Sequence, residues 1–187
     1  MAIEFNLPTN LTLLRIALIP LLAIVFYLPW EYSNIACTVI FAIAGFTDWL
    51  DGYLARKMSL ETAFGAFLDP VADKLMVAFV LVLIVQAEGS ATLAIASAII
   101  IGREITIASL REWMAEIGQR ATVKVSALGK WKTSAQMGAI GLLLYRDDFF
   151  GLPINLMGYW LLYIAACLTL WSMMQYLSAA YTTLKEE

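Results

Sequence analysis

The stretch DWLDGYLARKMSLETAFGAFLDPVAD, from Asp48 to Asp73, carries four aspartates within a chain that is otherwise rich in apolar residues. These aspartates are Asp48, Asp51, Asp69 and Asp73. An ionised carboxylate at the centre of a bilayer costs roughly 2.5 to 3.5 kcal/mol on the insertion scale, so four would cost about 10 kcal/mol without compensation. Ionisable groups at membrane depth are functional by default and need a partner. We therefore predict that this stretch binds metal.

The composition places the chain in a membrane. Of its 187 residues, 61% are apolar and only 14% are charged, which is far from the balance of a soluble protein. We expect one domain over residues 1–187. The first apolar run lacks the basic start of a cleaved signal peptide, so we expect a retained membrane helix there. The chain has no His, and both Cys residues lie in apolar runs, so we expect neither a disulfide framework nor a Cys/His zinc site.

The apolar runs predict an all-α polytopic membrane protein with six transmembrane helices. We expect helices at residues 11–28, 35–53, 63–85, 91–113, 133–145 and 156–177, because a span needs about 20 residues. An alternative start of the fifth helix lies near Val125. Basic residues gather in alternate connections, whereas Glu31, Glu88, Asp147 and Asp148 occupy the others. The positive-inside rule then predicts that both termini and the basic connections lie in the cytoplasm.

This topology gathers the four aspartates near the cytoplasmic ends of the second and third helices. The spacing within each pair places both members on one helical face. The short connection at residues 54–62 predicts that these two helices are antiparallel neighbours. The helices would therefore surround a polar cavity that faces the cytoplasm.

Carboxylates without His or Cys favour hard cations, chiefly Mg²⁺ or Mn²⁺. Two such ions would balance the four charges and suit phosphoryl displacement. Gly52 and Gly65 lack a Cβ and allow close approach of a ligand, and Arg56 can pair with a phosphate. Other interpretations of single residues stay open. The two glycines are also typical of close helix packing. Arg56 is also typical of a residue that sets membrane topology, and two of the aspartates could form a proton relay.

Eight residues of this stretch fit the pattern D-x2-D-G-x2-A-R-x8-G-x3-D-x3-D without departure. They are Asp48, Asp51, Gly52, Ala55, Arg56, Gly65, Asp69 and Asp73. The pattern resembles the signature of the CDP-alcohol phosphotransferase family. Three further stretches resemble those members of the family that use glycerol phosphate. They are PTNLTLLR at residues 8–15, GRE at 102–104 and GKWKT at 129–133. The resemblance therefore covers most of the chain.

The resemblance implies a homodimer of six-helix subunits in the bacterial cytoplasmic (inner) membrane, with two Mg²⁺ or Mn²⁺ ions per subunit. It implies that the four aspartates are metal ligands and that Asp73 is also the general base. The residues implied to contact the CDP part of the donor are Gly52, Arg56, Thr62 and Gly65. The residues that would close the nucleotide side are Asn10, Thr12 and Arg15.

The implied donor is CDP-diacylglycerol and the implied acceptor is sn-glycerol 3-phosphate. The glycerol hydroxyl would attack the phosphorus attached to diacylglycerol, releasing CMP and forming phosphatidylglycerophosphate, a precursor of anionic phospholipids. The acceptor is a dianion and needs a separate cationic pocket, for which the candidates are Arg103, Arg111, Lys124, Lys130 and Lys132.

Arg103 is the strongest of these candidates, because an unpaired Arg in an apolar helix would be energetically costly. Its alternative interpretation is pairing with Glu104. Lys130 and Lys132 are equally typical of residues that mark the inner face or attract anionic lipid.

Two other functions remain compatible with the sequence. The same chemistry could serve another acceptor, such as inositol phosphate or serine, since the aspartate motif handles only the shared donor. A protein of a different class, a cation transporter, could use the aspartates as an ion path. The gathering of the carboxylates near one face disfavours transport, and CMP release would separate the two classes.

Overall fold

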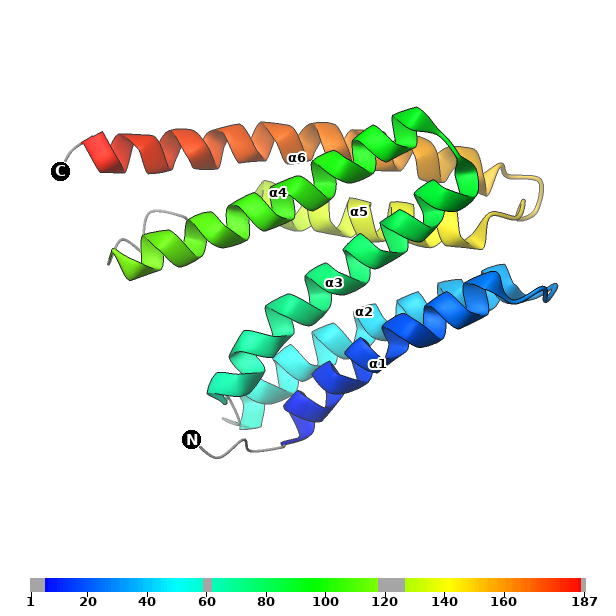
Figure 1. Cartoon of the computed structure of the whole chain (residues 1–187), viewed down its shortest axis with the longest axis horizontal. Coiled ribbons are helices and arrows are strands. Elements are labelled where there is room, and N and C mark those ends of the chain that lie inside the picture. The colour runs from blue at the N-terminus through cyan, green and yellow to red at the C-terminus, as the bar shows by residue number, and fades with distance from the viewer. Residues whose placement is uncertain (1–5, 59–61, 118–126, 186–187) are drawn as a thin grey trace.

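The computed structural model describes residues 6–58, 62–117 and 127–185. These residues form six α-helices, which confirms the all-α prediction. The helices are α1 (Leu7–Tyr27), α2 (Ser33–Met58), α3 (Ala63–Glu88), α4 (Ala91–Glu116), α5 (Ala127–Tyr145) and α6 (Ile154–Lys185). The helices run back and forth, so both ends of the chain lie at the same end of the molecule (Figure 1).

Several helices are longer than predicted, because polar residues at their ends extend them. α1 begins four residues early: the Asn6 side chain accepts a hydrogen bond from the Thr9 amide at 3.0 Å, and Pro8 occupies the first turn, two features that favour a helix start. α2 continues to Met58 and α6 to Lys185. α5 begins at Ala127, close to the earlier of the two starts predicted, although Val125 itself lies outside the described residues.

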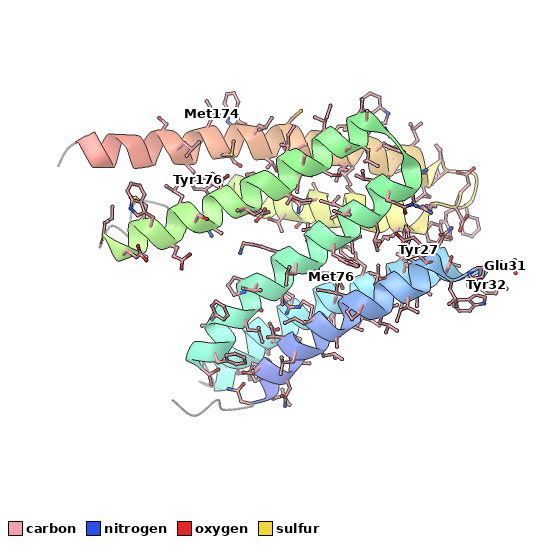
Figure 2. All side chains as sticks on the ribbon, viewed as in Figure 1. Tyr27, Glu31, Tyr32, Met76, Met174 and Tyr176 are labelled. Carbon is pink, nitrogen blue, oxygen red and sulfur yellow. The ribbon has the colours of Figure 1, made fainter. Side chains whose placement is uncertain are left out.

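Four of the described helices are long and apolar enough to cross a membrane: α1, α2 over Ser33–Leu54, α4, and α6 over Ile154–Ser178. Large apolar side chains such as Trp160 and Trp171 remain exposed on α6, as expected for a surface that faces lipid. Tyr27, Glu31 and Tyr32 lie together at the end of the molecule opposite the termini (Figure 2). The chain is therefore an all-α polytopic membrane protein.

The core is one cluster to which all six helices contribute, and its largest part lies where α3, α4, α5 and α6 meet. Fully buried side chains from these helices include Val80, Ile84, Ile100, Ile140 and Leu162. α5 packs along α6, α4 packs against α3 and α6, and α2 packs against α5. This arrangement leaves space for polar side chains on the side of α5 that faces α2, α3 and α4.

The prediction that α2 and α3 are antiparallel neighbours is confirmed only in part for the described residues. α1 packs against both helices, whereas α2 and α3 form no extended contact with each other (Figure 1). The two helices meet through side chains instead: oxygens of Asp48 and Asp51 on α2 and of Asp69 on α3 lie within 4.8 Å of one another, beside a cation of α1. A connection of a few residues makes two helices consecutive, but it does not determine which helix covers their polar faces.

Candidate active site

Arg15 of α1 lies at the centre of a carboxylate cluster. Its Nη1 is 2.9 Å from Asp48 Oδ1 and 3.2 Å from Asp69 Oδ1, and its Nη2 is 2.6 Å from Asp51 Oδ2. The Arg15 side chain is 2% exposed and that of Asp51 4% exposed, so this pair is removed from water. A buried charge that loses such a partner costs several kcal/mol. Arg15 therefore links α1 to α2 and α3 through the acidic residues of those two helices.

Asp48, Asp51 and Asp69, which we call the carboxylate triad, offer oxygens that all lie within 4.8 Å of one another. Asp48 and Asp69 come from different helices, and each side chain is 43% exposed, so a cation can reach the triad from solvent. Three carboxylates against one guanidinium leave two negative charges, the charge that one divalent cation would balance. Clustered carboxylate oxygens are the ligands that Mg²⁺ and Mn²⁺ prefer. The donor set fits such a metal.

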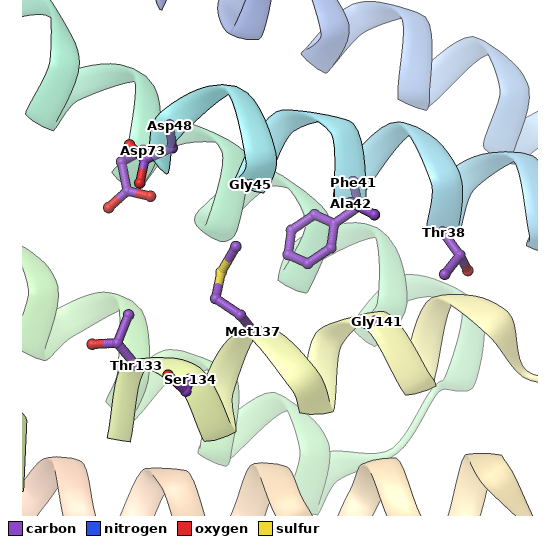
Figure 3. Close-up of a pocket in the computed structure, with 10 residues that line it drawn as sticks. All are labelled: Thr38, Phe41, Ala42, Gly45, Asp48, Asp73, Thr133, Ser134, Met137 and Gly141. Carbon is purple, nitrogen blue, oxygen red and sulfur yellow. The ribbon is translucent and has the colours of Figure 1, made fainter. Parts of the chain in front are cut away.

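Asp73, the fourth predicted ligand, lies outside the triad and beside Asp48. Its side chain is exposed, and it lines an elongated cavity of about 430 Å³ between α2 and α5. Figure 3 shows Asp48 and Asp73 together at one end of this cavity, with Phe41 and Met137 projecting into it. We call this space the apolar cavity, because Phe41, Met137 and small residues such as Gly141 form most of its walls. Its polar lining residues are Thr38, Thr133, Ser134 and the two aspartates.

A second cavity, of about 220 Å³, lies on the other side of Asp73 and is lined by residues of α3, α4, α5 and α6. We call it the cationic cavity, since the cations Lys74, Arg103 and Arg111 outnumber the carboxylates Asp73 and Glu104 in its lining. Arg103 forms an ion pair with Glu104, which confirms the alternative interpretation of this residue. Arg103 also lines the cavity, and its role in binding the acceptor stays a prediction. Asp73 thus belongs to both cavities.

Two further predicted residues organise the ends of α1 and α3. Thr62 caps α3 by accepting a hydrogen bond from the Gly65 amide at 3.0 Å, and its Oγ1 lies 3.4 Å from Thr9 Oγ1. A Cβ at Gly65 would come within 3.0 Å of Thr62 Oγ1 and 3.2 Å of Thr9 Oγ1. Gly65 therefore allows α1 and α3 to approach closely, which supports a role for this residue in helix packing. Its predicted role in ligand binding stays a prediction.

The N-terminal residues predicted to close the nucleotide side separate into two groups. Thr12 is buried and donates to Asp51 Oδ2 at 3.3 Å, so it joins Arg15 at the triad. Asn10 is exposed on α1 and forms no side-chain contact with the triad in the described part of the chain. Gly52 follows Asp51 and is half-buried.

Some predicted residues lie beyond what the structure describes. Lys124 falls outside the described residues. Arg56, Lys130 and Lys132 lie within α2 and α5, but their side chains are not among those described. Their predicted roles stay predictions.

Sequence reasoning missed three residues of the cationic cavity. Lys74, directly after Asp73, donates from Nζ to the Pro70 carbonyl at 3.1 Å. Gln136 of α5 and Tyr176 of α6 also line the cavity. The position of Lys74 next to a predicted ligand was a usable signal. A single Gln or Tyr in an apolar helix carries none, because such residues also occur in ordinary helix packing.

Comparison with known proteins defines the class of enzyme. The sequence profile of the CDP-alcohol phosphatidyltransferase family matches residues 5–171, and the chain belongs to this family. This confirms the resemblance drawn from the aspartate pattern. A relative from Haemophilus influenzae, named CDP-diacylglycerol–glycerol-3-phosphate 3-phosphatidyltransferase, is 55% identical over 177 residues, which cover 95% of this chain and 94% of the relative.

Relatives from other bacteria carry the same name. A protein from Yersinia pestis (strain Pestoides F) is 52% identical over 183 residues, covering 98% of this chain and 99% of its own length. One from Shigella flexneri serotype 5b is 50% identical over 184 residues, covering 98% of this chain and all of its own length, 100%. The similarity therefore extends well beyond the aspartate motif, through the helices that form both cavities.

Proposed function

We propose that this protein transfers the phosphatidyl group of CDP-diacylglycerol to sn-glycerol 3-phosphate, giving phosphatidylglycerophosphate and CMP. One structural observation carries the proposal: Asp73 lines both the apolar cavity and the cationic cavity. A lipid donor and a doubly charged acceptor need surroundings of opposite character. Asp73 and the neighbouring triad lie where those surroundings meet, and the names of the relatives agree with this pair of substrates.

The apolar cavity suits the lipid part of the donor. It extends from Asp48 past Phe41 and Gly45 to Thr38 on one wall, with Met137 and small residues of α5 on the other (Figure 3). Small side chains leave room for a hydrocarbon chain between α2 and α5. The pyrophosphate would then lie at the triad end, where Gly52, Thr62, Gly65 and Arg56 are the proposed contacts of the CDP part.

The cationic cavity suits the acceptor. Arg103 and Arg111 from α4 and Lys74 from α3 surround it, and guanidinium groups bind phosphate oxygens in pairs. Asp73 is at the same cavity and is the proposed base. It would accept the proton of the attacking glycerol hydroxyl as the new oxygen–phosphorus bond forms and the bond to CMP breaks. The proposed contributions of Lys124, Lys130 and Lys132 would add to the same positive field.

The triad and Asp73 are the proposed ligands of two Mg²⁺ or Mn²⁺ ions. Bound there, the ions would supply charge stabilisation for the pyrophosphate and the leaving CMP. With Asp73 included, four carboxylates against the one guanidinium of Arg15 leave three negative charges, more than one divalent ion balances, which supports this proposal. Arg15 and Thr12 would orient Asp51, and Asp48 and Asp69 would remain accessible from solvent.

The proposal includes the setting of the enzyme. We place it in the bacterial inner membrane as one domain over residues 1–187, with both termini and both cavities towards the cytoplasm. The charges support this orientation, since Glu31, Glu88, Asp147 and Asp148 lie at the opposite end and basic residues favour the inner face. The homodimer is proposed from the family resemblance, and light scattering in detergent would test it.

A panel of acceptors tests the proposed function. Purified protein in detergent is given labelled CDP-diacylglycerol with Mg²⁺ and, separately, sn-glycerol 3-phosphate, inositol phosphate or serine. We expect CMP release and a phosphatidyl product chiefly with glycerol phosphate. Preferred use of inositol phosphate would replace the acceptor while keeping the chemistry. No CMP release with any acceptor would contradict a transferase and favour the transporter interpretation.

Replacing Arg103 by Ala should raise the KM for glycerol 3-phosphate more than the KM for CDP-diacylglycerol. A hydrogen bond to a charged group contributes about 1.5 to 3 kcal/mol, so we expect a rise of roughly tenfold to a hundredfold. Initial rates with each substrate varied in turn would measure this. The matched control is Arg146→Ala, because Arg146 pairs with Glu88 at the other end of the molecule. Equal losses for donor and acceptor would remove Arg103 from the acceptor site.

A further inference from the structure

Gln136 is a buried polar residue that the proposed chemistry does not use. It lies on α5, is 3% exposed, and its Oε1 has no hydrogen-bond partner in the described part of the chain. The residue lines the cationic cavity. A buried amide without a partner is costly for a folded protein, so its presence at a cavity wall calls for a ligand that completes its hydrogen bonds.

A second unsatisfied group lines the same cavity. Arg103 of α4 is paired with Glu104 through Nη1, yet its buried Nε has no partner among the described residues. Two polar side chains from different helices, each with an unpaired buried atom, therefore line one cavity of about 220 Å³. This coincidence indicates a binding site for a small molecule with several hydrogen-bonding groups.

Gln136 differs chemically from the cations of the cavity, and among its neutral polar residues, which include Thr133 and Tyr176, it is the one with a buried atom that lacks a partner in the described structure. Lys74, Arg103 and Arg111 are cations that only donate hydrogen bonds, which suits a phosphate. The amide of Gln136 is neutral and offers both a donor and an acceptor, which suits a hydroxyl group. The cavity thus combines a set of groups for a phosphate with a separate group for an alcohol.

The position of Gln136 on α5 brings it near the reacting end of the acceptor. Thr133, one turn earlier, and Met137, the next residue, line both cavities. Gln136 therefore lies on the side of α5 where the two cavities meet at Asp73. An acceptor whose phosphate contacts the arginines and whose primary hydroxyl points to Asp73 would bring its middle carbon to this wall.

We propose that Gln136 determines acceptor specificity by hydrogen-bonding the secondary hydroxyl of glycerol phosphate, an inference that rests on the proposed function. The secondary hydroxyl does not react, so this contact affects selection and not chemistry. A site that is built to bind a hydroxyl rejects the analogue without it, because the polar group of the site is left unpaired.

The test compares sn-glycerol 3-phosphate with 3-hydroxypropyl phosphate, which has the same phosphate and primary hydroxyl but no secondary hydroxyl. The wild-type protein should prefer glycerol phosphate by about tenfold or more in kcat/KM. Gln136→Met, close in shape but unable to form the contact, should lower kcat/KM for glycerol phosphate by about tenfold and leave the value for the analogue within about threefold. The preference should therefore nearly vanish in the variant.

Ser97→Ala is the matched control. Ser97 is a buried residue of α4 whose hydroxyl also lacks a partner in the described structure, but it does not line the cationic cavity. Ser97→Ala should keep the wild-type preference for glycerol phosphate over the analogue. The comparison then distinguishes the general effect of losing a buried polar group from the loss of the Gln136 contact with the secondary hydroxyl. A similar collapse of the preference in Ser97→Ala would overturn the proposal.

Two further results would overturn it. Equal losses with both acceptors in Gln136→Met would show that the residue only supports the fold. Equal use of both acceptors by the wild-type protein would also refute it, and this measurement needs no variant to fold. A wild-type protein that releases CMP with neither acceptor would instead refute the proposed function, and the inference with it.

Discussion

Asp69→Asn should reduce turnover by roughly two to three orders of magnitude, the loss seen when a charge-stabilising group is removed from an active site. Asparagine keeps the shape of the side chain but removes the negative charge from an oxygen that lies within 4.8 Å of those of Asp48 and Asp51. We expect the same outcome for Asp48→Asn and Asp51→Asn. CMP release by purified protein, at equal amounts of inserted protein, is the measurement.

A matched control and a metal titration sharpen this prediction. Asp148→Asn changes an exposed aspartate at the other end of the molecule and should retain full activity. EDTA should stop the wild-type reaction, and Mg²⁺ or Mn²⁺ should restore it. An Asp69→Asn protein that turns over within tenfold of wild type would contradict the proposed metal site.

Arg15→Met should destabilise the metal-free protein by about 3 to 5 kcal/mol, the usual cost of removing one partner of a buried ion pair. Asp51 would be left 4% exposed with no guanidinium beside it, and Asp48 and Asp69 would lose the cation that lies 2.9 and 3.2 Å away. Methionine retains most of the side-chain volume, so the loss reports charge more than packing. Thermal unfolding in detergent with EDTA measures the effect.

Divalent cations should partly reverse that loss. Arg15 contacts oxygens of all three members of the triad, which are the atoms a metal would use, so the guanidinium and the metal compete for them. Mg²⁺ should therefore raise the unfolding temperature of Arg15→Met more than that of wild type. Lys57→Met, which removes an exposed cation of α2, should show neither effect. An unchanged stability gap with and without Mg²⁺ would contradict competition at the triad.

The aspartate pattern was enough to predict the family, because its information is local. Carboxylates at fixed spacing within apolar helices have few physical explanations, and helical periodicity places each pair on one face. The apolar runs likewise predicted six helices, with errors only at their polar ends. Those errors arose because capping groups such as Asn6 extend a helix past its apolar run.

The arrangement around the triad could not be predicted, because it depends on contacts between distant residues. Arg15 approaches Asp51 and Asp69 across 36 and 54 positions of sequence. Nothing local distinguishes a buried counter-ion from an arginine that contacts a nucleotide. The prediction that α2 and α3 are direct neighbours was confirmed for the carboxylates of the triad but not for extended packing of the two helices. A short connection constrains the ends of two helices, whereas α1 determines what lies between them.

Asp73 lines both the apolar cavity and the cationic cavity. If the proposed function holds, one reactant reaches Asp73 from the membrane and the other from water. The liponucleotide would arrive sideways from the bilayer between α2 and α5, whereas the polar alcohol would diffuse in from water. The rate would then follow two unlike quantities, the mole fraction of donor among membrane lipids and the molarity of acceptor in the cytosol. The acyl chains would complete the whole reaction without leaving the hydrocarbon layer.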